Sequence, residues 1–190
     1  MSRAERLLRE FRQRAQTPRA TQTNAIARTS WATAGPVVAL ADPMLPAQRI
    51  TIHHDGMTPF TSTSQRDAMR RLEQIRQAHR RRGWADIGYH FAVDPAGRVY
   101  QCRPMNLQGA HVKHNNERNI GVLVIGNYMD HRPSAGSLQG VVNLVAQLRS
   151  HHRLGRGTVF THQEIGATAC PGRLLQPKLV AMRTAGGPLA

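Results

Sequence analysis

The chain has 190 residues, enough for one ordinary domain and an extension, and its 40% hydrophobic but only 5% aromatic content predicts a mainly aliphatic core. No stretch of about 18 apolar residues occurs, so no transmembrane helix is expected. The net charge of +15 predicts attraction to polyanions, among them nucleic acid, teichoic acid, lipopolysaccharide and anionic membranes.

An arginine-rich segment opens the chain. A helix is predicted over residues 3–16 and should end before Pro18. Through Thr21, six arginines stand against Glu5 and Glu10, a net charge of +4 (six minus two). The segment lacks the continuous apolar run of a signal peptide, so we expect synthesis in the cytoplasm without one. It is either a solvated tail or a functional arm that is drawn to an anionic surface.

Two elements are predicted in the first half of the remaining chain. Residues 49–56, "RITIHHDG", alternate in the manner of a strand and end at two histidines and a glycine. A helix is predicted over residues 62–84, because apolar side chains recur at helical spacing. Ser64 and Asp67 have the spacing of a capping box at its start.

Four further elements follow. Residues 87–104 alternate on both sides of "DPAG", which is typical of a hairpin with a tight turn. Residues 119–128 are almost continuously apolar and predict a strand buried on both faces. A second helix is predicted over residues 137–153 and a last strand over residues 158–162. The alternation predicts an α/β domain with a central mixed β-sheet flanked by helices.

Histidine and cysteine side chains are the candidates for chemistry. Zinc binds histidine nitrogen and cysteine sulfur, and a catalytic site uses three protein ligands and keeps one position for water. The sequence offers His53 or His54, together with His162 and Cys170. Strand alternation sends His54 to the face opposite His53. Spacing alone leaves three readings of the last cysteine open: a packed turn, a disulfide with Cys102, or a metal ligand.

Four blocks carry a resemblance to a known family: "ITIHHDG", "GWADIGYHFAVDPAGRVYQCRP", "GAHVKHNNERNIGVLVIGNY" and "THQEIGATACPG". Together they resemble the zinc-dependent N-acetylmuramoyl-L-alanine amidases, which include the amidase-type phage lysozymes and the peptidoglycan recognition proteins. The resemblance covers residues 25 to 176 and implies a peptidoglycan recognition protein/amidase-like fold. We therefore divide the chain into a basic arm (1–21), a zinc amidase domain (22–180) and a C-terminal tail (181–190).

The resemblance also implies residue roles. His53, His162 and Cys170 correspond to the ligands of a Zn²⁺ cofactor. Tyr89 corresponds to the catalytic tyrosine, and Thr168 stands where the recognition proteins have threonine. Both hydroxyl groups are candidate donors to the oxyanion that forms when the amide is attacked.

A second group implied by the resemblance belongs to the substrate. His111 and Asn116 match positions that line the peptidoglycan groove in relatives, and Lys113 of the same loop is a candidate partner for a carboxylate of the stem peptide. Glu164 either orients His162 as a hydrogen-bond partner or is an ordinary loop acid. Cys102 is expected to be a free, semi-buried thiol. Four histidines are interpreted as surface residues: His79, His131, His151 and His152.

The leading functional hypothesis is hydrolysis of the amide bond between N-acetylmuramic acid and L-alanine in bacterial peptidoglycan, by a phage or prophage endolysin or another lytic enzyme. A secreted toxin and a wall-recycling enzyme fit the same features. We expect a monomer that acts on the cell wall after release or delivery and whose basic arm meets an anionic envelope. The alternatives are a non-catalytic peptidoglycan-binding module and a nucleic-acid-binding protein; without interleaved aromatic residues, no specific nucleic acid partner is expected.

Overall fold

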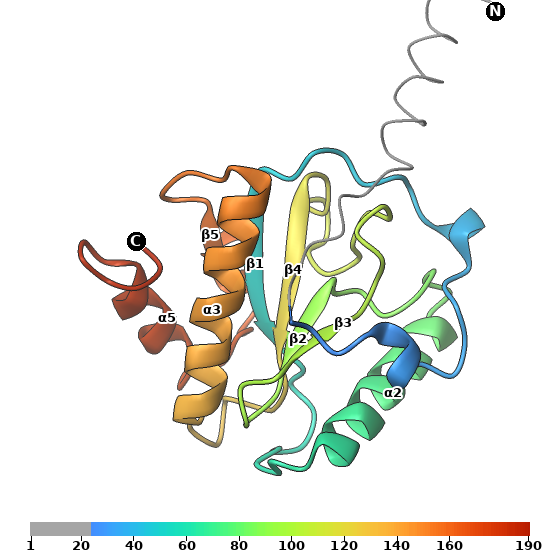
Figure 1. Cartoon of the computed structure of the whole chain (residues 1–190), viewed down its shortest axis with the longest axis horizontal. Coiled ribbons are helices and arrows are strands. Elements are labelled where there is room, and N and C mark those ends of the chain that lie inside the picture. The colour runs from blue at the N-terminus through green and yellow to red at the C-terminus, as the bar shows by residue number, and fades with distance from the viewer. Residues whose placement is uncertain (1–23) are drawn as a thin grey trace, which may run out of the picture.

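Five short strands form one sheet in this computed structural model, which describes residues 24–190 of the chain (Figure 1). The strand order is β3-β2-β4-β1-β5. Only β2 and β3 pair antiparallel, as the two arms of the predicted hairpin, and the other neighbours are parallel. The predicted mixed sheet is therefore confirmed. The strands are β1 (Arg49–His54), β2 (Phe91–Val93), β3 (Val99–Gln101), β4 (Asn119–Val124) and β5 (Val159–Thr161).

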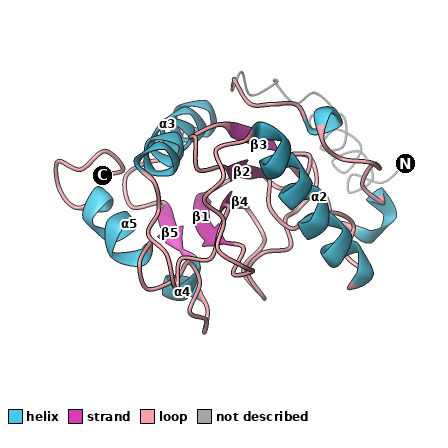
Figure 2. Cartoon of the chain, turned by 90° about the horizontal axis from the view of Figure 1, so that it is seen from below, coloured by secondary structure: helices cyan, strands magenta, loops and turns pink. Residues whose placement is uncertain are grey.

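Helices cover both faces of the sheet (Figure 2). Within residues 24–190, none is long and apolar enough to cross a membrane. The predicted arm and its helix lie outside the described residues, and the proposed division of the chain stays a prediction. The helices are the 3-10 helices η1 (Arg28–Ser30) and η2 (Val38–Leu40), and the α-helices α2 (Gln65–Arg81), α3 (Ala135–His152), α4 (His162–Ile165) and α5 (Gln176–Arg183).

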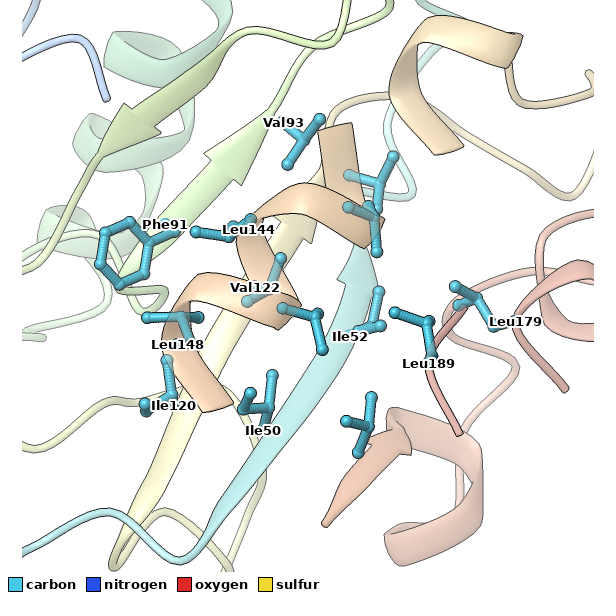
Figure 3. Close-up of a cluster of buried hydrophobic side chains, with 14 of the residues drawn as sticks. Ile50, Ile52, Phe91, Val93, Ile120, Val122, Leu144, Leu148, Leu179 and Leu189 are labelled. Carbon is cyan, nitrogen blue, oxygen red and sulfur yellow. The ribbon is translucent and has the colours of Figure 1, made fainter. Parts of the chain in front are cut away.

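Strand β4 separates two apolar clusters. All six of its residues are buried, as the continuous apolar run predicted. Ile120 and Val122 pack with α3 and α5, and Figure 3 shows them beside Leu144 and Leu148 of α3. Leu123 faces the other way and packs with α2. Alternation along one strand thus positions helices on both sides of the sheet.

The start of α2 differs from the predicted capping box. The Ser64 side chain accepts a hydrogen bond from the Asp67 backbone N–H, so half of the box is present. The Asp67 carboxylate does not return a bond to Ser64. It accepts instead from the Ser62 hydroxyl and from Arg70. A nearby hydroxyl and guanidinium therefore replace the reciprocal bond.

A carboxylate on α2 holds the N-terminal part of the domain. Glu73 accepts hydrogen bonds from the Thr33 backbone and hydroxyl, and from Arg76 and Gln77. Burial alone would raise the pKa of Glu73, but these donors outweigh it and bring the pKa from 4.5 to about 2. The charged form is therefore bound more strongly in the folded state than in the unfolded chain.

We expect a Glu73→Gln variant to have a flatter acid-stability profile. A depressed carboxylate pKa stabilises the fold above pH 4.5, and this stabilisation is lost as the pH falls through about 2. Because the group is partly solvated, we expect a contribution of about 1 kcal/mol rather than the full value of the shift. Urea unfolding at a series of pH values measures it. Glu117→Gln, at an exposed acid, is the control, and an unchanged profile in Glu73→Gln would contradict the assignment.

Candidate metal centre

Two parallel strands bring two of the predicted ligands to one edge of the sheet. His53 lies near the end of β1, and His162 directly follows β5 as the first residue of α4. Ile52 pairs with Thr161, and each of these two residues is directly followed in the sequence by one of the histidines. Their imidazole centroids lie 4.6 Å apart. Figure 2, which shows the molecule of Figure 1 from below, places α4 beside β5 and β1.

The third predicted ligand joins this pair. The Cys170 sulfur lies 3.7 Å from His53 Nδ1, and ligand atoms of His53, His162 and Cys170 all lie within 4.8 Å of one another. Zinc bonds of about 2.0 to 2.3 Å at tetrahedral angles place ligand atoms about 3.3 to 3.8 Å apart. The donor set suits zinc, and the distance between His53 and Cys170 falls within this range; zinc binding itself stays a prediction.

The neighbouring polar groups remove two of the alternatives left open by the sequence. His54 points to the other face, where its Nδ1 accepts a hydrogen bond from the Tyr128 backbone N–H. Cys102 and Cys170 are both free, so no disulfide joins them. Cys102 is fully buried rather than semi-buried, with 1% of its surface exposed.

Burial keeps the candidate ligands uncharged. It lowers the pKa of His53 well below the usual value, and the neighbouring His111 and His162 lower it further. Burial likewise lowers the pKa of His162 and raises the pKa of Cys170 to about 12. The backbone N–H of His54 donates to the Cys170 sulfur and partly offsets the last effect. A bound divalent cation would supply the positive charge that favours the thiolate form of Cys170.

The two predicted hydroxyl donors occupy different positions. Tyr89 is half-buried, with its ring centroid 5.2 Å from that of His53. Burial and the nearby Cys170 raise the pKa of Tyr89 well above its usual range, so the phenol keeps its proton as a donor. Thr168 is exposed, and its hydroxyl oxygen accepts from the Cys170 backbone N–H, which leaves its own proton free. Their catalytic roles stay predictions.

The predicted substrate residues divide into exposed and structural positions. Lys113 is exposed. The Asn116 side chain accepts hydrogen bonds from the backbone N–H groups of His111 and Val112, so it shapes the loop. The His111 side chain is buried and hydrogen-bonded to His53. Contact of these three residues with a substrate stays a prediction.

Two other side chains near the site differ from, or refine, the sequence interpretation. His79 is buried rather than on the surface, and its Nδ1 accepts from the backbone N–H of Gly88, next to Tyr89. Helical spacing with the buried face of α2 was the available signal. Glu164 accepts from the Thr161 backbone N–H and pairs with Arg183, so it caps α4 without bonding His162.

The sheet, its helices and the two-histidine, one-cysteine cluster define a peptidoglycan-recognition and amidase-type fold. The family described as N-acetylmuramoyl-L-alanine amidase matches residues 43–173. The chain belongs to this family. It is 31% identical over 155 residues to a peptidoglycan-recognition protein of Drosophila simulans, a match that covers 81% of this chain and 84% of that protein.

Two solved structures give the same fold. Peptidoglycan recognition protein-LE, in complex with tracheal cytotoxin (monomeric diaminopimelic acid-type peptidoglycan), has a TM-score of 0.74 and 28% identity, covering 83% of this chain and 92% of that chain. The N-acetylmuramoyl-L-alanine amidase LysC of Clostridium intestinale has a TM-score of 0.60 and 25% identity, covering 74% of this chain and 92% of that chain. Both a peptidoglycan-binding relative and an amidase are therefore similar to this chain.

Proposed function

We propose that the protein is a zinc-dependent amidase that cleaves the bond between N-acetylmuramic acid and L-alanine in bacterial peptidoglycan. The observation that carries the proposal is the convergence of His53, His162 and Cys170, whose ligand atoms lie within 4.8 Å of one another. A similar amidase and a similar recognition protein bound to a peptidoglycan fragment support the substrate class.

The proposed chemistry needs a nucleophile, an activated carbonyl and a donor to developing charge. When bound, zinc lowers the pKa of water toward about 7 and polarises a carbonyl group. His53, His162 and Cys170 would hold the ion. The Tyr89 hydroxyl, whose raised pKa keeps it protonated, would donate to the amide oxygen as negative charge develops, and its ring lies near His53. The Thr168 hydroxyl is a second candidate donor.

The biological setting is proposed from the same chemistry and from the charge. A lytic enzyme of a phage or prophage is consistent with a net charge of +15, because bacterial envelopes carry anionic polymers. The protein would be made in the cytoplasm and would reach the wall after release or delivery, acting there as a monomer. The basic residues 1–21 would add attraction to the envelope.

Digestion of purified sacculi tests the proposal. The zinc-loaded protein should release stem peptides with a free N-terminal L-alanine, detected by labelling of new amino groups and by mass spectrometry. Removal of the metal with a chelator should stop release, and added zinc should restore it.

Two other results would identify the rival functions. Sedimentation of the zinc-loaded protein with sacculi, without peptide release, would favour a peptidoglycan-binding module. Tight DNA binding with a steep salt dependence would favour a nucleic-acid-binding protein, since phosphate contacts release counterions.

A further inference from the structure

A buried histidine lies behind the candidate metal centre, on the side of His53 away from Cys170. His53 Nε2 lies 3.0 Å from Nδ1 of His111, while His53 Nδ1 faces the Cys170 sulfur at 3.7 Å. The two imidazoles meet nearly edge to face, at an interplanar angle of 87°. The two nitrogens of His53 therefore have separate partners, one in the candidate metal centre and one in the protein interior.

The far side of His111 has a partner that only accepts. Its Nε2 lies 3.1 Å from the backbone oxygen of Asn119, the first residue of β4. A carbonyl oxygen cannot donate, so His111 Nε2 must carry the proton. A neutral imidazole has one ring proton, which leaves His111 Nδ1 bare as an acceptor. His53 Nε2–H must then donate to it, and the lone pair of His53 is left on Nδ1, the nitrogen that faces Cys170.

Two glycines leave the space that the His111 ring occupies. A β-carbon at Gly109 would lie 2.5 Å from His111 Cδ2, and one at Gly121 would lie 2.6 Å from the same atom. Only glycine at both positions leaves room for the ring. The Asn116 side chain fixes the backbone of the same loop through the N–H groups of His111 and Val112.

We propose that His111 is a positioning residue that holds the proton of His53 on Nε2 and orients the Nδ1 lone pair toward the metal. It acts through His53 rather than on the substrate, and only 8% of its surface is exposed. Partners of this kind fix the tautomer and ring orientation of a metal-binding histidine. The inference deepens the proposed function, because it rests on the same metal centre.

Two substitutions separate this role from simple packing. His111→Phe keeps an aromatic ring at this position but removes the Nδ1 acceptor, so the buried His53 N–H is left without a partner. His111→Asn is smaller but places a carbonyl oxygen close to the position of Nδ1. If His111 only fills space, the phenylalanine variant should keep zinc affinity better. If it acts through His53, the asparagine variant should keep it better.

The experiment measures zinc affinity of the full chain by competition with a chromophoric chelator. We expect His111→Phe to bind zinc about 10- to 100-fold more weakly than the parent protein and His111→Asn to recover most of the loss. The proposal would be overturned if His111→Phe bound zinc as tightly as the parent protein. It would also be overturned if His111→Asn bound zinc as weakly as His111→Phe.

A second measurement requires no variant and no metal. Nitrogen-15 NMR of the metal-free parent protein should find His53 and His111 both protonated on Nε2 and bare on Nδ1. A proton on Nδ1 of His53 would overturn the proposal even if both variants failed to fold. Failure of the parent protein to bind zinc would count against the proposed function instead, and the tautomer would still decide the role of His111.

Discussion

Replacement of Cys170 by serine is expected to abolish zinc binding and peptidoglycan hydrolysis together. The thiolate is the only ligand of the three that carries a negative charge when it binds a metal. A serine hydroxyl is a poor substitute because it does not ionise near neutral pH. We expect zinc affinity to fall more than about 100-fold, beyond the effect of losing a ligand's hydrogen-bond partner, and peptide release to fall below detection.

The other cysteine provides the matched control. Cys102 is buried and free, it is not among the three candidate ligands, and its thiol faces the backbone oxygen of Tyr100 at 3.8 Å. A serine there can donate to the same oxygen, so Cys102→Ser should keep zinc and activity. Zinc is measured by mass spectrometry of dialysed protein. A Cys170→Ser protein that still holds stoichiometric zinc would show that the three-ligand site is wrong.

The sequence predicted the main elements of the fold because their patterns are local. In β4 a continuous apolar run, and in α3 apolar residues at helical spacing, predict which side chains are buried. Neither pattern depends on the rest of the chain. Helix α5 was not predicted, and its single buried residue, Leu179, explains why. A helix with one fully buried apolar residue carries almost no periodic signal.

The site was predictable where strand geometry alone decides it. Strand alternation was enough to separate His53 from His54, and the register of β1 with β5 brings His162 alongside. The role of His111 could not be found in this way. It depends on a hydrogen bond to the backbone oxygen of Asn119 and on the space that two glycines leave for the ring. Both are contacts that form only in the folded chain, and no sequence pattern predicts them.

Replacement of Tyr89 by phenylalanine should separate zinc binding from catalysis. The ring is retained, so its contacts with His53 and His79 should persist. The phenol is not among the three candidate ligands, and zinc content should equal that of the parent protein. Loss of one donor to a developing oxyanion typically costs about 100- to 1,000-fold in rate. We therefore expect kcat for peptide release to fall by this factor while affinity for sacculi changes little.

A second tyrosine on the other face of the sheet tests whether the effect is specific. Tyr128 is buried beside His54 and donates its hydroxyl to the Ile125 backbone oxygen. Tyr128→Phe loses that bond, so it should lower the stability of the fold by about 1 kcal/mol and leave kcat near the parent value. Equal losses of rate in both variants would point to general destabilisation. A Tyr89→Phe protein with full activity would remove the phenol from the proposed mechanism, because no chemistry at the amide oxygen would then depend on its proton.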